Sequence, residues 1–338
     1  MHRHCTILAW SVLMGVAITA HATAGKPVPD ELRQRAANGD VAAQVALGHA
    51  LLDDGKPEDR AAANDWFRKA AEQGSADGAW MFGSGYMASN PLTRKTNFAT
   101  AIEWMKKSVQ IDHNADHMAA LAFACMIAGN AQEGMAWAQK AAGGGSPKGM
   151  QMLAMAYAFG QMGAQKDPAA ARHWLLLAAR KGDPESEAML GQFYLTNLLG
   201  HVDTKAGIDW MQKAAAAGNA KAAGTLATLY LTGKMNVPKD PARAMPLARQ
   251  ALAANDKLGH YAMGIAYANG SGVAKDPRQA WYQLAIASRM DANHQLEGAA
   301  DYMSQVATQL SPGQLQTLEA KVDAEMASRQ KNTQSKAP

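Results

Sequence analysis

The chain has 338 residues and a formal net charge of +4; 48% of its residues are hydrophobic and 18% are charged. This composition excludes wholesale disorder and a fibrous protein. The small surplus of positive charge, with no run of basic residues, argues against nucleic acid as a partner. Aromatic residues make up only 7%, while alanine is abundant and methionine reaches 20, which favours closely packed helices over a β-sandwich.

The N-terminus has the pattern of a secretory signal peptide. A short basic start at Arg3 precedes an apolar stretch over residues 5–20, and two Ala-x-Ala sites end at Ala22 and Ala24. The apolar stretch is short for a membrane span. The pattern therefore predicts cleavage of residues 1–24 and a periplasmic or secreted protein, without stable membrane insertion afterwards.

A tryptophan column recurs through the rest of the chain with a spacing near 36 residues, which points to a repeat array. Leu247 and Gln283 continue the column, and a Gly, Asn or Asp stands eight residues after each member, where a helix can end. We expect each tryptophan to fill the same slot between helices. The predicted structural repeat core is Trp66, Trp104, Trp137, Trp174 and Trp210.

A second column, about twenty residues earlier in each repeat, places a large residue before Gly or Ala, as in Leu190-Gly191. The small residue lets a neighbouring helix approach closely. Between the columns, Lys-Asp-Pro marks a helix start at Pro168, Pro241 and Pro277. Each repeat is therefore predicted as helix A, a loop, helix B and a stop. The predicted repeats span 40–74, 75–112, 113–145, 146–182, 183–218, 219–255 and 256–291.

These motifs resemble the Sel1-like repeat, an α/α family related to tetratricopeptide repeats, between Asp40 and Asp291. The resemblance implies an all-α fold, a right-handed α/α superhelical solenoid of about seven helix-pair repeats. Terminal repeats need caps, because an apolar face would otherwise meet water. We expect an N-terminal capping helix at 25–39, C-terminal capping helices at 292–330 and a disordered tail at 331–338.

The resemblance also implies a non-catalytic adaptor or scaffold that binds a protein or peptide in a bacterial-type cell envelope. In such arrays the row of A helices usually lines the inner surface, and large apolar side chains there suit a peptide partner. The predicted partner-binding groove consists of His49, Trp80, Ser84, Met87, Phe123, Met126, Met155, Leu195, Tyr261 and Ile265. The identity of the partner is not encoded in these motifs.

Two functions are alternatives to the adaptor: a β-lactam-binding or hydrolysing enzyme and a periplasmic copper-binding protein. The secreted Sel1-like proteins linked to β-lactams are cysteine-rich, whereas cleavage here would leave only Cys125. The methionines at 150, 152 and 155 could favour Cu(I), and His113 with His117 could share a helix face. Packing roles explain these residues better. We therefore predict no catalytic residues, no metal site and no cofactor.

Overall fold

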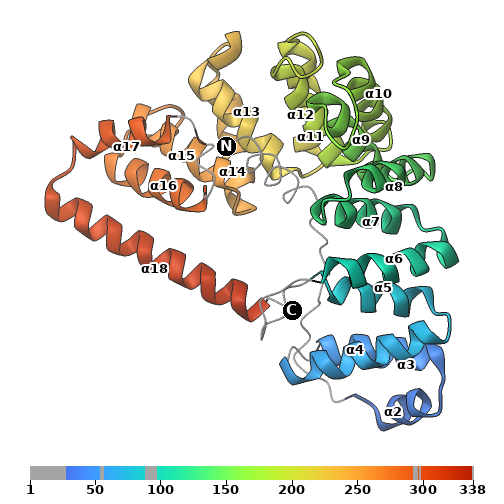
Figure 1. The fold of residues 1–338 in the computed structure, drawn as a ribbon. Coiled ribbons are helices and arrows are strands. Elements are labelled where there is room, and N and C mark those ends of the chain that lie inside the picture. Colours follow the sequence, from blue (N-terminus) through green and yellow to red (C-terminus); the bar gives the residue numbers. More distant parts are fainter. Residues whose placement is uncertain (1–27, 54–56, 88–96, 292–295, 297, 337–338) are drawn as a thin grey trace. The chain divides into compact units, whose positions relative to one another are not determined.

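The computed structural model describes residues 28–53, 57–87, 97–291, 296 and 298–336, apart from the side chains of residues 57–58 and 331–336 (Figure 1). The predicted signal peptide lies outside these residues. Every regular element in the described ranges is a helix, which confirms the all-α prediction. The chain divides into two compact units, with the boundary between Asp167 and Pro168.

Unit 1 contains an N-terminal helix and the helices of the first repeats. Three A helices of this unit pack against the B helix that follows them, in the pairs α3 with α4, α5 with α6 and α7 with α8. The helices of unit 1 are α2 (Asp30–Ala37), α3 (Val41–Asp53), α4 (Pro57–Glu72), α5 (Ala76–Gly85), α6 (Phe98–Asp112), α7 (Ala115–Ile127), α8 (Ala131–Gly143) and α9 (Pro147–Phe159).

Unit 2 repeats the same pairing in α11 with α12, α13 with α14 and α15 with α16. Two further helices follow the last pair, and both pack against α16. The helices of unit 2 are α10 (Pro168–Ala179), α11 (Pro184–Leu195), α12 (Thr204–Ala216), α13 (Ala220–Thr232), the 3₁₀ turn η1 (Lys234–Asn236), α14 (Pro241–Ala253), α15 (Lys257–Asn269), α16 (Pro277–Met290), α17 (Ala299–Ala307) and α18 (Pro312–Lys336).

The predicted helix starts are found in the structure. Three B helices begin at the proline of Lys-Asp-Pro, and the Asp240 carboxylate accepts the backbone N–H of Arg243 at 3.0 Å. The A helix of the second repeat starts equally sharply at Ala76, two residues after the stop at Gly74. There the Ser75 hydroxyl accepts the N–H of Gly78 at 3.0 Å. These caps satisfy backbone donors that the first turn leaves unpaired.

The helix stops follow the predicted column with two corrections. Gly74, Gly145, Gly182, Gly218 and Asn255 all have a positive φ. In the second repeat the left-handed residue is His113, with φ 51°, and not the predicted Asp112. Asp291 has φ −92° and takes no left-handed conformation. It is buried and accepts from Lys257 Nζ at 2.6 Å.

Within a helix pair, two positions meet in the core. One is the Gly or Ala of the large-small column in helix A, and the other is the residue directly after the tryptophan column in helix B. A Cβ added at Gly48 would lie 2.5 Å from Phe67 Cε1, and one at Gly264 would lie 2.6 Å from Leu284 Cγ. Glycine is required there because a large side chain of helix B occupies the space.

The two columns compensate each other in volume. Where helix A carries glycine, helix B carries a large residue. Where helix A carries Ala122 or Ala227, helix B carries Ala138 or Ala248, and all four are fully buried. The fourth repeat departs from this pattern. The glycine pairs are Gly48 with Phe67, Gly83 with Met105, Gly191 with Met211 and Gly264 with Leu284.

The ends of the array carry additional helices. Helix α2 buries Ala36 beside the first repeat. At the other end, Ser311 and Gln314 form a reciprocal cap at the start of α18: the Ser311 N–H donates to Gln314 Oε1 at 2.9 Å, and Ser311 Oγ accepts the Gln314 N–H at 3.3 Å. This helix continues to Lys336, so helical structure passes residue 330, where the sequence analysis placed the start of a disordered tail.

Candidate partner-binding surfaces

The repeat tryptophans are half-buried and lie at the edge of the core, where Trp66, Trp104 and Trp137 pack against the buried clusters. The fully buried position is the next residue, such as Phe67 or Met211. A lysine three residues on covers the ring in four repeats, because residues i and i+3 share a helix face. The distances from Nζ to ring centroid are 3.9 Å for Lys69 and Trp66, 3.6 Å for Lys107 and Trp104, 4.1 Å for Lys140 and Trp137, and 4.1 Å for Lys213 and Trp210. Trp174 is also half-buried.

Four of the ten predicted groove residues cannot offer surface to a partner. Met155, Leu195, Tyr261 and Ile265 are each at most 5% exposed, so the structure places them in the core. A place on the A-helix row does not ensure exposure, since neighbouring helices cover some of these positions. His49 is exposed, and five others are partly exposed. Those five are Trp80, Ser84, Met87, Phe123 and Met126.

Trp80, which stands outside the tryptophan column, is held in place by a polar neighbour. Its ring stacks on His117 of α7, with centroids 3.9 Å apart and planes 8° from parallel. His117 Nδ1 lies 2.9 Å from Asp112 Oδ2. Trp80 also packs against the apolar cluster around Leu121. The stack therefore fixes the orientation of a partly exposed aromatic side chain on the A-helix row of unit 1.

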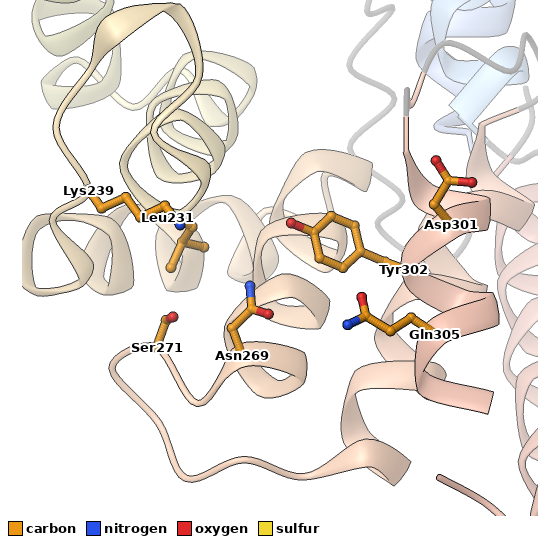
Figure 2. Close-up of a pocket in the computed structure, with 7 residues that line it drawn as sticks. All are labelled: Leu231, Lys239, Asn269, Ser271, Asp301, Tyr302 and Gln305. Atoms are coloured by element: carbon orange, nitrogen blue, oxygen red, sulfur yellow. The ribbon is translucent and has the colours of Figure 1, made fainter. Parts of the chain in front are cut away.

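A polar pocket of about 500 Å³ opens at the C-terminal ends of the A helices α13 and α15 in unit 2 (Figure 2). Helix α17 forms its other wall. Tyr302 and Gln305 extend from α17 toward Asn269, while Lys239 reaches in from the opposite side. The seven lining residues are Leu231, Lys239, Asn269, Ser271, Asp301, Tyr302 and Gln305.

None of the seven lining residues belongs to the predicted groove. Leu231 lies on the A helix of the sixth repeat, but its side chain is buried. Lys239 belongs to a Lys-Asp-Pro motif, which is explained as a helix start. Asp301, Tyr302 and Gln305 lie on α17, outside the repeats, so the repeat pattern does not predict them.

The copper alternative finds no support in the accessible surface. Met150, Met152 and Met155 are all buried. His113 and His117 do not share a helix face, since His113 caps the end of α6 and α7 begins at Ala115. Nowhere in the described ranges do three or more His, Cys, Asp or Glu side chains gather in a way that could hold a metal ion.

The single cysteine of the described residues is buried in the core of unit 1. Cys125 is fully buried, and this burial raises the pKa of its thiol to about 11. A thiol in that state is a poor nucleophile at neutral pH. Among the described helices, none combines the length and the apolarity that crossing a bilayer would require.

Paired helices, interlocking small and large residues and Gly-terminated B helices define an α/α repeat protein. The model of the Sel1 repeat matches the chain seven times, so the chain belongs to the Sel1 repeat family, and the prediction of about seven such repeats is confirmed. The matched residues are 41–75, 79–113, 125–146, 147–183, 184–219, 220–256 and 258–290.

This chain is similar to solved structures of other proteins. The crystal structure of a Sel1 repeat protein from Oxalobacter formigenes is 25% identical, with a TM-score of 0.53 over 66% of this chain and 87% of that chain. The protective antigen c5321 of uropathogenic Escherichia coli strains, which displays an SLR fold, is 21% identical, with a TM-score of 0.43 over 86% of this chain and 85% of that chain. No curated protein matches. Sel1 repeat proteins are commonly protein-interaction scaffolds.

Proposed function

We propose that this chain is an exported, non-catalytic adaptor that binds a peptide segment of another protein in the bacterial-type cell envelope or outside the cell. Membership of the Sel1 repeat family supports the binding role. The apolar stretch over residues 5–20 and the Ala-x-Ala sites support export. The alternatives of a β-lactam-directed enzyme and a copper carrier have less support, because Cys125 and the methionines at 150, 152 and 155 are buried.

The observation that carries the proposal is the polar pocket between α13, α15 and α17. Its volume of about 500 Å³ lies within the range of ordinary ligand sites. Asn269 and Gln305 each offer an acceptor oxygen and donor N–H groups, which match the N–H and C=O of a peptide unit. Lys239 and Asp301 add one charge of each sign. The pocket is therefore suited to a short, polar stretch of extended peptide.

The partly exposed residues of the predicted groove supply a second contact area in unit 1. Trp80 is fixed by its stack on His117, so its ordering is complete before a partner binds. Rigid aromatic side chains are effective anchors at interfaces. We assign Trp80 and Phe123 to partner contact as part of the same proposal.

The binding role is tested with peptides selected from a random displayed library against the full chain. Lys239→Ala should weaken a selected peptide by about 10- to 100-fold, the worth of one charge-assisted hydrogen bond. Lys275→Ala is the matched control. Lys275 occupies the same Lys-Asp-Pro position and lies close to Gly270, as Lys239 lies close to Gly233, but Lys275 does not line the pocket.

Equal affinities for the two lysine variants would remove the pocket from the proposal, and failure to select any peptide would contradict the binding role itself. Export is tested separately by mass spectrometry of the secreted or periplasmic protein, with an expected N-terminus at Thr23 or Gly25. An intact N-terminus at Met1 on cytoplasmic protein would contradict it.

A further inference from the structure

Helix α18 covers the last repeat through an apolar contact. Leu318 and Val322 of α18 are buried in one cluster with Trp281 and Ile286 of α16. Val306 of α17 joins the same cluster. This contact fixes the first half of α18 and contains no titratable group in its centre.

The second half of α18 is held through Arg329. Its guanidinium Nε donates to Glu325 Oε1 at 2.9 Å on the same helix. Its other nitrogens donate to Asn255, to Met290 Sδ at 3.3 Å, and to His260 Nε2, where the two nitrogens are 3.2 Å apart. One side chain of α18 thus contacts the start of α15 and the end of α16.

The contact with Arg329 determines which ring nitrogen of the neutral His260 carries the proton. A guanidinium can only donate hydrogen bonds, so Nε2 must present its lone pair to Arg329. The proton of the neutral imidazole then sits on Nδ1, which donates to Gln283 Oε1 at 2.7 Å. His260 is only 5% exposed. A second proton on the ring would sit on Nε2 and point at a guanidinium N–H. The two cations would then face each other directly.

We propose that His260 and Arg329 form a pH-sensitive latch, in which protonation of His260 releases the second half of α18 from the last repeat. The latch is a property of the fold, and it stands whether or not the chain binds a peptide.

The direction of the pH effect follows from the surroundings of His260. Burial lowers its pKa from the usual value, and the positive charge of Arg329 lowers it further, against the raising effects of Gln283, Glu325 and Asp256. A lowered pKa means that the docked state favours neutral His260. The docking free energy is therefore complete above pH 6.5 and declines as the pH falls through the docked-state pKa.

Other titratable groups lie near the latch without duplicating its response. Glu325 and Asp256 are the carboxylates that act on His260. Tyr282 of α16 has its pKa raised, chiefly by burial, and stays neutral throughout. Lys257 forms an ion pair with the buried Asp291 at 2.6 Å. Between pH 7.5 and pH 5, histidine is the group of this cluster that changes charge.

Amide hydrogen exchange of the full chain, corrected for intrinsic rates, measures the release at pH 7.5 and pH 5. In the native chain, protection of residues 322–329 should fall by up to about thirtyfold, because pH 5 is 1.5 units below the unperturbed histidine pKa. Protection of α13 and α14 should hold. Each variant is compared with itself at the two pH values, so a general loss of stability does not affect the result.

Two variants remove the response by different means. His260→Gln cannot gain a proton, and Arg329→Gln offers a carboxamide that can face either form of the imidazole. Both should show a protection ratio near one. The matched control is Arg289→Gln, which breaks another ionic contact of α18, from Arg289 to Asp323 at 2.5 Å, and should keep the native ratio.

A native ratio near one would overturn the latch, and so would a native ratio that survives in His260→Gln. If Arg329→Gln alone kept the native ratio, histidine protonation would act without Arg329, and the assignment of the latch to this pair would also be wrong.

Discussion

Replacing Gly48 by alanine tests the interlocking of the helix pairs. The new Cβ would lie 2.5 Å, 2.7 Å and 2.9 Å from three ring atoms of Phe67, distances that real Cβ contacts do not reach. The ring must therefore move within a packed core. Overpacking of this kind costs about 1–3 kcal/mol, more than the gain of up to about 1 kcal/mol expected from alanine in a helix.

The partner variant gives the second side of a double-mutant cycle. Phe67 is 1% exposed, so Phe67→Ala should cost about 3–5 kcal/mol of unfolding free energy. In the double variant the Gly48→Ala methyl group enters space that the ring has left. We expect the double variant to be about 1–3 kcal/mol more stable than the sum of the single effects predicts. The result would reproduce the Ala–Ala pairing of Ala122 and Ala138.

Urea unfolding followed by circular dichroism measures all three variants, with equal slopes required for a valid comparison. Trp66→Ala serves as the neighbouring control. Its ring is half-buried and lies under Lys69, with Nζ 3.9 Å from the centroid, so its loss should cost about 1–2 kcal/mol. Additive effects of Gly48 and Phe67 would refute the interlocking. A Trp66→Ala cost equal to that of Phe67→Ala would return the tryptophans to the core.

Two further predictions use matched positions elsewhere in the chain. Gly259→Ala should destabilise the fold by about 1–3 kcal/mol, since its Cβ would lie 2.3 Å from a backbone nitrogen of α14. Gly143→Ala is the control and should be neutral or stabilising, because its Cβ would have no atom within 4 Å. Thermal unfolding compares the two variants, and equal melting temperatures would contradict the close approach at Gly259. In a chain with Cys5 replaced by serine, Cys125 should resist iodoacetamide at pH 8 until urea unfolds the protein, because burial raises the pKa of its thiol to about 11; rapid labelling of the folded chain, measured by mass spectrometry, would contradict its burial.

The helices and their starts could be predicted from the sequence because their signals are local. Asp240 precedes Pro241, and Ser311 precedes Pro312, and both patterns have a direct physical meaning at a helix N-terminus. The helix stops could be predicted in the same way where the stop residue is glycine. The prediction was wrong at Asp112, since the left-handed residue is His113, and a one-residue shift of this kind is decided by packing.

A lysine three residues after a repeat tryptophan indicates which of two adjacent large residues faces the core. Trp66 and Phe67 are adjacent, so a 36-residue period cannot tell which of them faces the core. The lysine at position i+3 can, because Lys69 shares a helix face with Trp66 and its ammonium group must reach water. A large residue on the face of a lysine belongs at the edge of the core, and its neighbour belongs inside.

The pocket lies where the repeat pattern stops, and this explains why repeat columns did not find it. Lysine recurs in the Lys-Asp-Pro motif at Lys166, Lys239 and Lys275, yet only Lys239 lines the pocket. The difference arises from α17, which carries Tyr302 and Gln305 and belongs to no repeat. Positions that repeat are constrained by packing against the next helix pair, so they hold little information about a partner. Selectivity in this array should therefore reside in residues that the repeats do not share, and variation at α17 should change which peptides bind without changing the fold.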